Sequence, residues 1–469
     1  MNIPHNGARH RIMRALWPDY RMVWRWHFLA GLLCLPFVAF LSLTGGIYLF
    51  KPQVDDLIDW RYEHLATGGN NAPPSQVVAA ALSTVPGSHL LAYELPRTAH
   101  SATRVIVSHG ADAVRVYVDP HSLKILKHVS EEHRFERIIF NLHGQLLLGN
   151  VGSVIVEMVA SWTIVLIVTG LYLWWPRGRK GQTGGVVYPR LNARGRTRLR
   201  DLHAVTGAWL SLFVILFLAS GLPWSFVWGH ALQSVEKTIG RITTIQDWEI
   251  GHVRVRDTIA GTPATPPVPD TMTGMKGMSS MPGMDMPPVA TAPVPPLDEA
   301  ALDRVALTGA TLGLRYPVLL TPPPQAGQPW QVRSDTQDRP WRMTARITPD
   351  GQVVGRDTFA DKPIVDRVIG YGVAAHEGQL FGIANQIINL VVALGLLAMS
   401  IAAFVMWSRR RPPGHIGIPP SVRDGHLGGA TITCIVVMGI VLPELGAALM
   451  VIVLLCALTN PGRNSADKS

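Results

Sequence analysis

The chain has 469 residues, of which 48% are hydrophobic and only 16% are charged. Soluble domains carry about 25% charged residues, so this composition excludes an ordinary soluble protein and predicts a polytopic α-helical membrane protein with sizeable soluble parts. The formal net charge is +10. It does not indicate a nucleic-acid partner, because the Lys and Arg residues cluster beside apolar runs, as they do on the cytoplasmic side of membrane proteins.

The first spanning segment is expected at residues 27–50, after a basic cytoplasmic tail at residues 1–26. This apolar run is too long for the core of a signal peptide and ends without a small-residue cleavage site. We therefore expect it to be retained, with the N-terminus in the cytoplasm. Three similar runs lie at residues 151–175, 203–228 and 383–407. The basic loops that return the chain to the cytoplasm are residues 176–202 and 408–426.

Two soluble segments, residues 51–150 and 229–382, are expected on the periplasmic face. Each reads as a helix followed by strands and turn residues, which predicts two small α+β modules. The predicted helices are 75–83 and 297–307, and the predicted strands are 104–109, 114–118, 123–129, 331–334, 342–348 and 352–356. Residues 261–297 are rich in Pro, Met and Gly and predict a disordered insert.

The last apolar run, residues 427–458, exceeds the about 20 residues that one crossing needs. Pro443-Glu444 lies in its middle. The run can therefore form one kinked span or a hairpin of two short spans. We expect the single kinked span, which places the C-terminus outside.

Four histidines occur in two matching contexts. His27 and His203 each open an apolar run. Each is followed at the same spacing by a glycine and then by a hydroxyl residue with a second glycine, namely Gly31, Thr44 and Gly45 after His27, and Gly207, Ser220 and Gly221 after His203. His143 opens His-Gly-Gln-Leu-Leu-Leu-Gly, and His376 opens His-Glu-Gly-Gln-Leu-Phe-Gly. This spacing predicts an internal duplication, with His27 and His203 near the inner membrane face and His143 and His376 near the outer face.

Two neutral imidazoles that face each other across a helical bundle can bind one haem iron from both axial positions. Such ligation leaves no open position on iron, so it suits electron transfer better than oxygen chemistry. The paired glycines Gly31 and Gly207, and Gly149 and Gly382, would let a flat macrocycle or a neighbouring helix approach closely. The sequence therefore predicts a four-helix haem-binding bundle. The alternative is that the histidines are structural residues at helix ends.

The other histidines and the cysteines give weaker signals. His230 follows the third apolar run and is a candidate substrate-side ligand, although the first repeat has no histidine at the matching place. Cys34, Cys434 and Cys456 lie inside apolar runs and predict neither a disulfide framework nor a metal site. No Cys-x-x-Cys-His motif occurs, which excludes covalent c-type haem. The histidines of the first soluble segment are expected on its surface, namely His64, His89, His100, His109, His121, His128 and His133.

A methionine series lies within the predicted insert. Its members are Met272, Met275, Met278, Met281, Met284 and Met286. Thioethers are soft ligands that select Cu(I), so the series is a candidate copper site. The alternative is a low-complexity linker that is rich in methionine.

Motifs for hydrolysis and for nucleotide cofactors are absent from the sequence. It contains no Gly-x-Ser-x-Gly, His-Glu-x-x-His or P-loop, and no Gly-x-Gly-x-x-Gly after a strand. Electrons would therefore have to come from a cytoplasmic or membrane donor.

The order of spans, the two histidine motifs and the two helix–hairpin modules resemble the PepSY-associated transmembrane family. That family includes bacterial iron-regulated inner-membrane proteins and ferric-siderophore reductases, and the resemblance covers roughly residues 20–460 apart from the insert. It implies a multi-pass inner-membrane protein with periplasmic PepSY-like modules and two b-type haems. His27 and His203 would hold the inner haem, and His143 and His376 the outer one. The methionine series departs from a purely siderophore-directed member and raises copper as the metal.

Three hypotheses follow. The chain is a transmembrane electron-transfer protein that reduces a ferric siderophore or another oxidised metal chelate in the periplasm. Alternatively, it is a non-enzymatic periplasmic copper-handling protein that uses the methionine series. Thirdly, the chain is a regulatory protein whose PepSY-like modules bind a partner.

Overall fold

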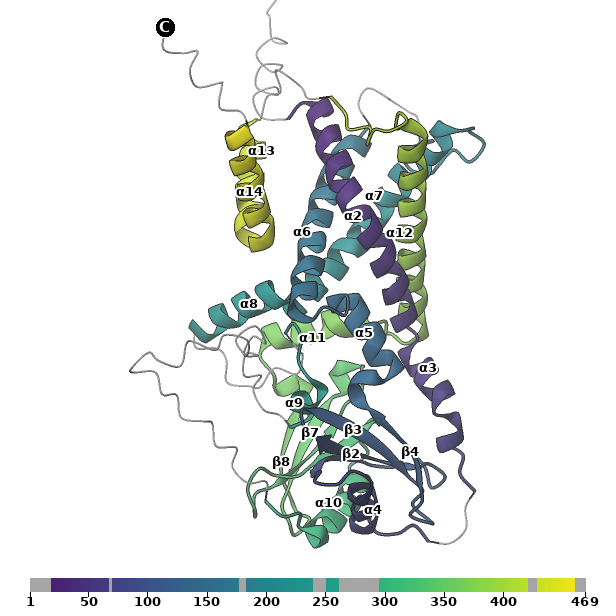
Figure 1. Ribbon diagram of the computed structural model, residues 1–469, viewed down its shortest axis with the longest axis vertical. Coiled ribbons are helices and arrows are strands. Elements are labelled where there is room, and N and C mark those ends of the chain that lie inside the picture. The colour runs from purple at the N-terminus through teal and green to yellow at the C-terminus, as the bar shows by residue number, and fades with distance from the viewer. Residues whose placement is uncertain are drawn as a thin grey trace, which may run out of the picture. The chain divides into compact units, whose positions relative to one another are not determined.

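The computed structural model describes residues 18–66, 70–176, 183–238, 250–260, 295–420 and 428–459. The chain forms two compact units (Figure 1). The helical unit comprises residues 1–51, 139–252 and 372–469, and the sheet unit comprises residues 52–138 and 253–371. The methionine series, from Met272 to Met286, lies outside the described residues.

Four helices within the described residues are long and apolar enough to cross a membrane. They are α2 (Tyr20–Tyr48), α6 (Gly149–Trp174), α7 (Arg196–Gly221, continued by a short 3-10 turn at Leu222–Trp224) and α12 (Ile383–Arg410). A helix pairs its own backbone N–H and C=O groups, for which lipid offers no hydrogen-bond partners. Both α2 and α7 pack against α6 and α12. In a four-helix arrangement, α2 and α7 therefore face each other across a diagonal.

Helices α2 and α7 begin about two turns before the histidines that were expected to open them. Asp19 caps α2, and its carboxylate accepts a hydrogen bond of 2.7 Å from Arg21 N–H. The basic residues in the first two turns of α2 and α7 are thus helical, because long Arg stems can lie along an apolar surface while their charged ends stay in water. His27 and His203 consequently lie inside their helices.

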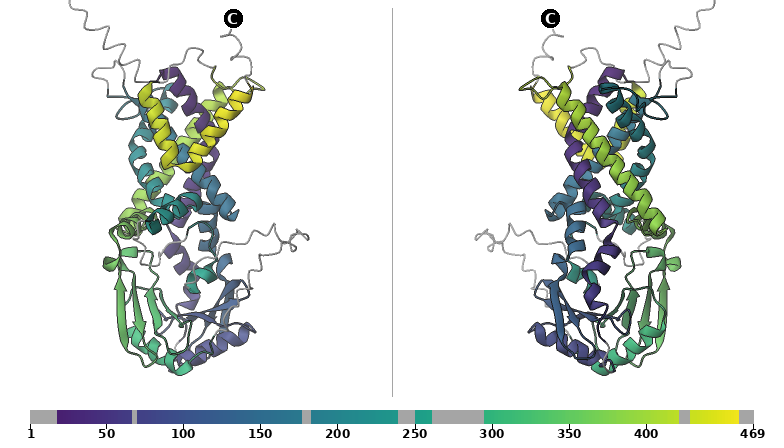
Figure 2. Two further views of the ribbon diagram at one scale, coloured as in Figure 1. Left: turned by 90° about the vertical axis from the view of Figure 1, so that its left-hand side faces the viewer. Right: turned by 90° about the vertical axis from the view of Figure 1, so that its right-hand side faces the viewer.

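The last apolar run forms two helices, α13 (Gly429–Val441) and α14 (Pro443–Thr459), which pack against each other. A Cβ atom built on Gly439 would lie 3.3 Å from the Cα atom of Gly446. These residues would be about 10 Å apart along one continuous helix, so the chain reverses at Leu442-Pro443. The two helices form a V in Figure 2. The expectation of one kinked span was therefore wrong, and the hairpin alternative describes this segment.

The sheet unit contains one antiparallel sheet with the order β4-β3-β2-β1-β5-β6-β7-β8. The strands are β1 (Leu90–Glu94), β2 (Thr103–His109), β3 (Asp112–Val118), β4 (Ile125–Ser130), β5 (Val318–Thr321), β6 (Trp330–Ser334), β7 (Met343–Ile347) and β8 (Val353–Thr358). Helices α4 (Pro74–Thr84) and α10 (Glu299–Thr311) pack together over its core. Asp303 on α10 accepts two hydrogen bonds of 2.8 Å from Ser75 on α4.

The two predicted α+β modules share this sheet. Strand β1 pairs with β5, with Tyr93 opposite Leu320 and Glu94 opposite Leu319. Neither strand was predicted, because both are short apolar runs with no polar alternation to mark them as strands. Burial on both faces explains that pattern, since every residue of β1 is buried.

The structure also contains shorter helices. They are α3 (Lys51–Ile58), α5 (Phe135–Gln145), α8 (Phe226–Thr238), α9 (Val255–Ala260) and α11 (Ile364–His376). The last turns of α5 and α11 belong to the helical unit and carry His143 and His376.

Candidate functional site

The four predicted histidines form two facing pairs in the helical unit. His27 on α2 faces His203 on α7, with 6.2 Å between ring centroids and 78° between ring planes. His143 on α5 faces His376 on α11, with 6.3 Å between centroids and 71° between planes. All four residues are half-buried. The structure therefore pairs the histidines as the sequence predicted.

Left-handed backbone positions place the second pair. After His143, Leu146 and Leu147 have φ values of 51° and 57°, and Gly149 has a φ of 59°. This run reverses the chain from α5 into α6. After His376, Gly378 and Gly382 adopt φ values of 74° and 58° before α12 begins. The sequence predicted glycine at two of these places for close approach, but Gly149 and Gly382 serve the turns.

The hydroxyl of Thr44 on α2 fixes the tautomer of His143. Its oxygen lies 3.1 Å from His143 Nδ1 and 3.1 Å from the carbonyl oxygen of Phe40. Threonine has one hydroxyl proton and a carbonyl can only accept, so this proton goes to Phe40. The hydroxyl oxygen must then accept the Nδ1–H of His143. His143 Nε2 keeps its lone pair, which is the form of imidazole that binds a metal.

The same arrangement recurs at His376. Ser220 Oγ on α7 lies 3.0 Å from His376 Nδ1 and donates to the carbonyl of Phe217 at 3.1 Å. The Phe217 carbonyl also lies 3.1 Å from His376 Nδ1. Both neighbours accept from Nδ1–H, so the lone pair of His376 is again on Nε2.

In the first pair, the Nδ1–H of each histidine also donates to an oxygen of a neighbouring helix. Thr169 Oγ1 on α6 lies 3.0 Å from His27 Nδ1 and donates to the carbonyl of Val165 at 2.6 Å. His203 Nδ1 lies 3.4 Å from the carbonyl oxygen of Met399 on α12. Each Nδ1 thus donates, and all four Nε2 atoms have a free lone pair.

The second pair is neutral at physiological pH. Burial and the neighbouring His376 lower the pKa of His143 to about 4, and burial lowers the pKa of His376. A neutral imidazole is the state that metal ligation requires.

The ring spacing fits a shared metal. Two imidazoles that bind one metal from opposite sides, each at about 2 Å, have their centroids about 6 Å apart. A histidine pair supplies only two ligands, so it suits a metal whose other ligands come with it, as in haem. Within the described residues, no group of three or more His, Cys, Asp or Glu side chains could hold a bare metal ion.

Glycines beside the imidazoles leave space at the rings. A Cβ on Gly45 would lie 2.9 Å from His143 Cε1, and one on Gly170 would lie 3.1 Å from His27 Cε1. The glycines that were expected to provide this space do not face the rings. Gly31 faces Leu166, and Gly207 faces Met399.

A sequence signal for these neighbours exists but was missed in part. A hydroxyl residue followed by glycine occurs at Thr44-Gly45, Thr169-Gly170 and Ser220-Gly221. In each case the hydroxyl bonds to Nδ1 and the glycine lies against the same ring. Thr169-Gly170 was not recognised, because it lies on α6, outside the matched stretches that follow His27 and His203.

His230, the further candidate ligand, is not part of either pair. It is exposed on α8, and its Nδ1 lies 2.5 Å from the carbonyl oxygen of Phe226 on the same helix.

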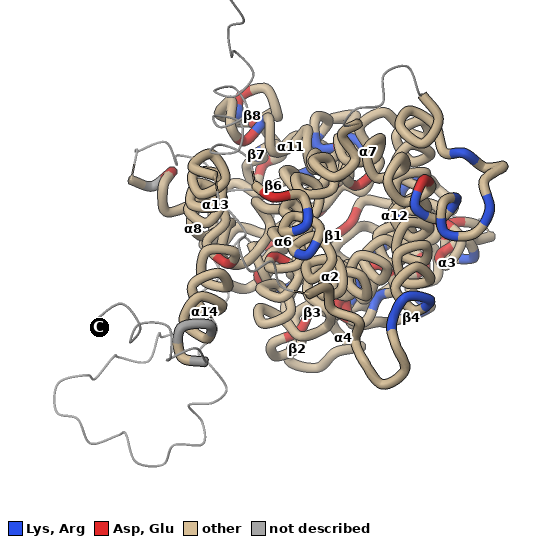
Figure 3. Tube along the Cα trace, turned by 90° about the horizontal axis from the view of Figure 1, so that it is seen from above, with Lys and Arg blue, Asp and Glu red and all other residues tan. Residues whose placement is uncertain are grey.

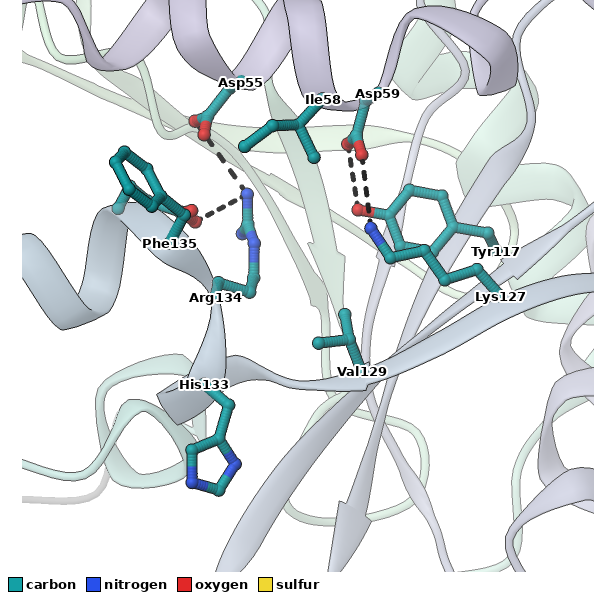
Figure 4. Close-up of a pocket in the computed structure, with 10 residues that line it drawn as sticks. Asp55, Ile58, Asp59, Tyr117, Lys127, Val129, His133, Arg134 and Phe135 are labelled. Carbon is teal, nitrogen blue, oxygen red and sulfur yellow. Dashed lines mark hydrogen bonds and ion pairs between the residues drawn. The ribbon is translucent and has the colours of Figure 1, made fainter.

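A separate cavity of about 120 Å³ lies in the sheet unit (Figure 4). Its charged lining residues pair with one another. Lys127 pairs with Asp59, and Arg134 pairs with Asp55 and Glu136. Ligand pockets usually measure about 300–1,000 Å³, so this cavity is too small for a metal chelate. Its ion pairs hold β3, β4 and the neighbouring helices together.

A model of the family described as PepSY-associated TM region matches residues 24–410. No curated protein matches the chain.

Proposed function

The chain belongs to the PepSY-associated TM region family, and we propose that it is a di-haem protein that carries electrons across the bacterial inner membrane. It is a multi-pass membrane protein. In this proposal it reduces a ferric siderophore, or another oxidised metal chelate, in the periplasm for iron uptake. The supporting observation is that all four histidines donate through Nδ1 and pair at 6.2 and 6.3 Å.

His27 and His203 would hold one b-type haem, and His143 and His376 the other. Haem, when bound there, would supply one-electron redox chemistry. The chain's own residues set the ligand geometry. Hydroxyls and carbonyls fix each tautomer and ring orientation, and such outer hydrogen bonds raise the basicity of the ligand.

The two pairs lie far enough apart to serve opposite membrane faces. His27 and Thr44, the partner of His143, are separated on α2 by about 25 Å of helical rise. The hydrocarbon core of a bilayer is about 30 Å thick. The four histidines therefore define two centres in series across most of that thickness.

Basic residues gather at the end of the bundle that carries the first pair. The guanidinium of Arg410 on α12 lies 4.8 Å from the ring centroid of Trp24 and 4.7 Å from that of Phe28. Helix α7 starts at Arg196 at the same end, which Figure 3 views from above. The positive-inside rule favours the cytoplasm for this end and for the N-terminus. Electrons would enter there from a cytoplasmic or membrane donor.

The equivalent hydrogen bonds at His143 and His376 support the predicted duplication. In each case a hydroxyl on one of the two diagonal helices accepts from the histidine in the last turn of a short helix. The matched register in the sequence and the matched partners in space favour one ancestral unit.

The spacing of the methionine series favours copper handling as a second candidate function. Six thioethers within fifteen residues provide soft ligands for Cu(I). This site would act without the histidines, so deletion of residues 271–287 should change copper binding and leave haem content unchanged.

The direct test is an absorption spectrum of the purified protein, oxidised and then reduced, with a pyridine haemochrome assay. Two b-type haems per chain are expected. His203→Ala and His376→Ala should each remove one low-spin species, and His230→Ala is the matched control that should retain both. A colourless protein from haem-replete cells would refute the proposal.

A further inference from the structure

Three side-chain amides are buried in the first two turns of α12, shortly after His376. They belong to Asn385, Gln386 and Asn389, of which 6%, 5% and 4% are exposed. Helix α12 is one of the four that are long and apolar enough to cross a membrane. Polar side chains inside such a helix are costly unless they have partners, and they often mark a functional site. The hydrogen bonds of these amides show where each one acts.

Asn389 holds the backbone of His376. Its Nδ2 donates to the His376 carbonyl at 3.0 Å and to the Ala375 carbonyl at 2.7 Å. Both carbonyls belong to the last turn of α11, where carbonyls lack partners inside the helix. Within the described part of the chain, the His376 carbonyl receives no other hydrogen bond. Since a carbonyl can only accept, the Asn389 amide must present its NH2 group to α11.

Asn385 orients the amide of Asn389. The two residues lie four apart on α12, so they share one face of the helix. Asn385 Nδ2 donates to Asn389 Oδ1 at 3.2 Å and to the Ala375 carbonyl at 3.1 Å. The oxygen of the Asn389 amide is thus bound on the side away from α11, which keeps its NH2 group on the two carbonyls.

Gln386 acts on the other side of the second histidine pair. Its Nε2 donates at 3.0 Å to the carbonyl of Leu49, the residue that follows α2. A Cβ on Gly378 would lie 3.0 Å from Leu49 Cδ2 and 3.3 Å from Gln386 Cγ, so the three residues are closely packed. Leu49 lies about 8 Å along the chain from Thr44, the hydroxyl partner of His143. The amides of α12 therefore contact both the end of α11 and the end of α2.

The first repeat holds its short helix without such amides. Gly149 and Gly382 precede the bodies of α6 and α12 with φ values of 59° and 58°, and aligning them places Gly152 opposite Asn385. A Cβ on Gly152 would lie 1.6 Å from the carbonyl oxygen of Gln145, so α6 packs directly on the last residue of α5. At the matching position of the second repeat, the Asn385 side chain makes the contact instead.

We propose that Asn385 and Asn389 are positioning residues for the haem of His143 and His376, because they fix the backbone of His376. Gln386 anchors the end of α2 beside them. This inference rests on the proposed function, and it assigns to the amides a role in setting the geometry of one haem centre.

The place of His376 in its helix explains why its backbone needs separate support. His376 is the last residue of α11, and helix ends open more easily than helix centres. The hydrogen bonds of Nδ1–H to Ser220 and to the Phe217 carbonyl set the rotation of the ring. They do not hold the end of the helix itself. Ring rotation and backbone position are therefore fixed by different groups.

The alternative is that the amides are only general links between helices, as polar residues in membrane bundles often are. Such links would stabilise the whole bundle, whereas positioning residues affect one centre. The first pair provides an internal reference. Its contact on α12 is the Met399 carbonyl, about 15 Å along the helix from Asn389.

Electron paramagnetic resonance of the full chain loaded with haem tests the positioning. The signal of a low-spin haem with two imidazole ligands depends on the angle between their planes, which is 71° for His143 and His376. Asn389→Leu removes both donors at similar size, so this signal should shift and the haem affinity should fall roughly tenfold. Asn385→Leu keeps the bond to the His376 carbonyl and should have a smaller effect. Asn192→Leu makes the same chemical change at an exposed position and should have none.

The outcomes separate this inference from the proposed function. The signal of the haem at His27 and His203 should stay the same in every variant. Unchanged signals and affinity in Asn389→Leu, or equal losses at both haems, would overturn the inference while both haems are present. Absence of both haems from the unaltered protein would refute the proposed function itself, and the inference with it.

Hydrogen–deuterium exchange of the full-length apoprotein gives a readout without haem. Asn389→Leu should make exchange at residues 377–380 roughly tenfold faster, because the end of α11 loses two hydrogen bonds. Unchanged exchange there would also overturn the inference. If Asn389→Leu does not fold, Asn385→Leu decides by the same measurements.

Discussion

The hydrogen bonds between hydroxyl side chains and the histidines predict how much haem affinity should fall when each hydroxyl is removed. Thr44→Val removes the acceptor of the His143 Nδ1–H while keeping a side chain of similar size. The Leu41 carbonyl also accepts a hydrogen bond from His143, and it remains in this variant. Ser220→Ala removes the matching hydroxyl at His376, and the Phe217 carbonyl remains 3.1 Å from Nδ1. Each substitution therefore leaves a backbone carbonyl as an acceptor.

Loss of an outer hydrogen bond to a metal-binding histidine typically weakens metal binding by about 10- to 100-fold. We expect Thr44→Val and Ser220→Ala to lie at or below the lower end of that range. The remaining carbonyl spares each histidine the cost of an unsatisfied buried donor, which is about 1–3 kcal/mol. Haem titration of the apoprotein, followed by absorption spectra, measures both affinities. A loss of about 100-fold or more in either variant would refute this reasoning.

Three other predictions follow from the contacts. Gly45→Ala should displace the His143 ring and lower haem content by up to one equivalent per chain. Gly31→Ala should have little effect, because its new Cβ would lie 3.7 Å from a flexible leucine. A pyridine haemochrome assay of both variants measures their haem content. Glu131→Gln breaks the buried pair with Arg115 and should destabilise the sheet unit by roughly 3–5 kcal/mol, visible as faster amide exchange in β3 and β4 of the full chain. Burial raises, and nearby arginines lower, the pKa of Glu131, to about 2 overall. Because this pKa lies below the unfolded value, its stabilising effect is present above pH 4.5 and should be lost as the pH falls towards 2; thermal unfolding across that range measures it.

Much of the helical unit could be predicted from the sequence, because long apolar runs give a strong and local signal. The pairing of His27 with His203 was predicted because the glycine and hydroxyl residues that follow each histidine have the same spacing. The hydroxyl of Thr169 was not found, since it lies on α6, outside the matched stretches that follow His27 and His203. Sequence spacing can place a residue on its own helix, but it cannot say which helix lies opposite.

The hairpin shows a second limit. Pro443-Glu444 was recognised as a break, and a proline inside a long apolar run is compatible with both a kink and a reversal. The structure separates the two at the reversal, where Trp228 Nε1 on α8 donates to the Val441 carbonyl at 3.1 Å and Leu442 and Leu445 are buried. That interaction links residues far apart in the chain, so no local pattern could have decided between the alternatives.

Both units are completed by residues from two halves of the chain. The first half is here the first predicted repeat, residues 27–175, and the second half is the second repeat, residues 203–407. His27 and His143 come from the first half, and each is paired with a histidine of the second half. The sheet follows the same rule, because β1 of the first half pairs with β5 of the second. Neither half alone could form a bis-histidine site or the continuous sheet. The predicted duplication therefore describes two units that depend on each other, and electron transfer would be a property of the whole chain.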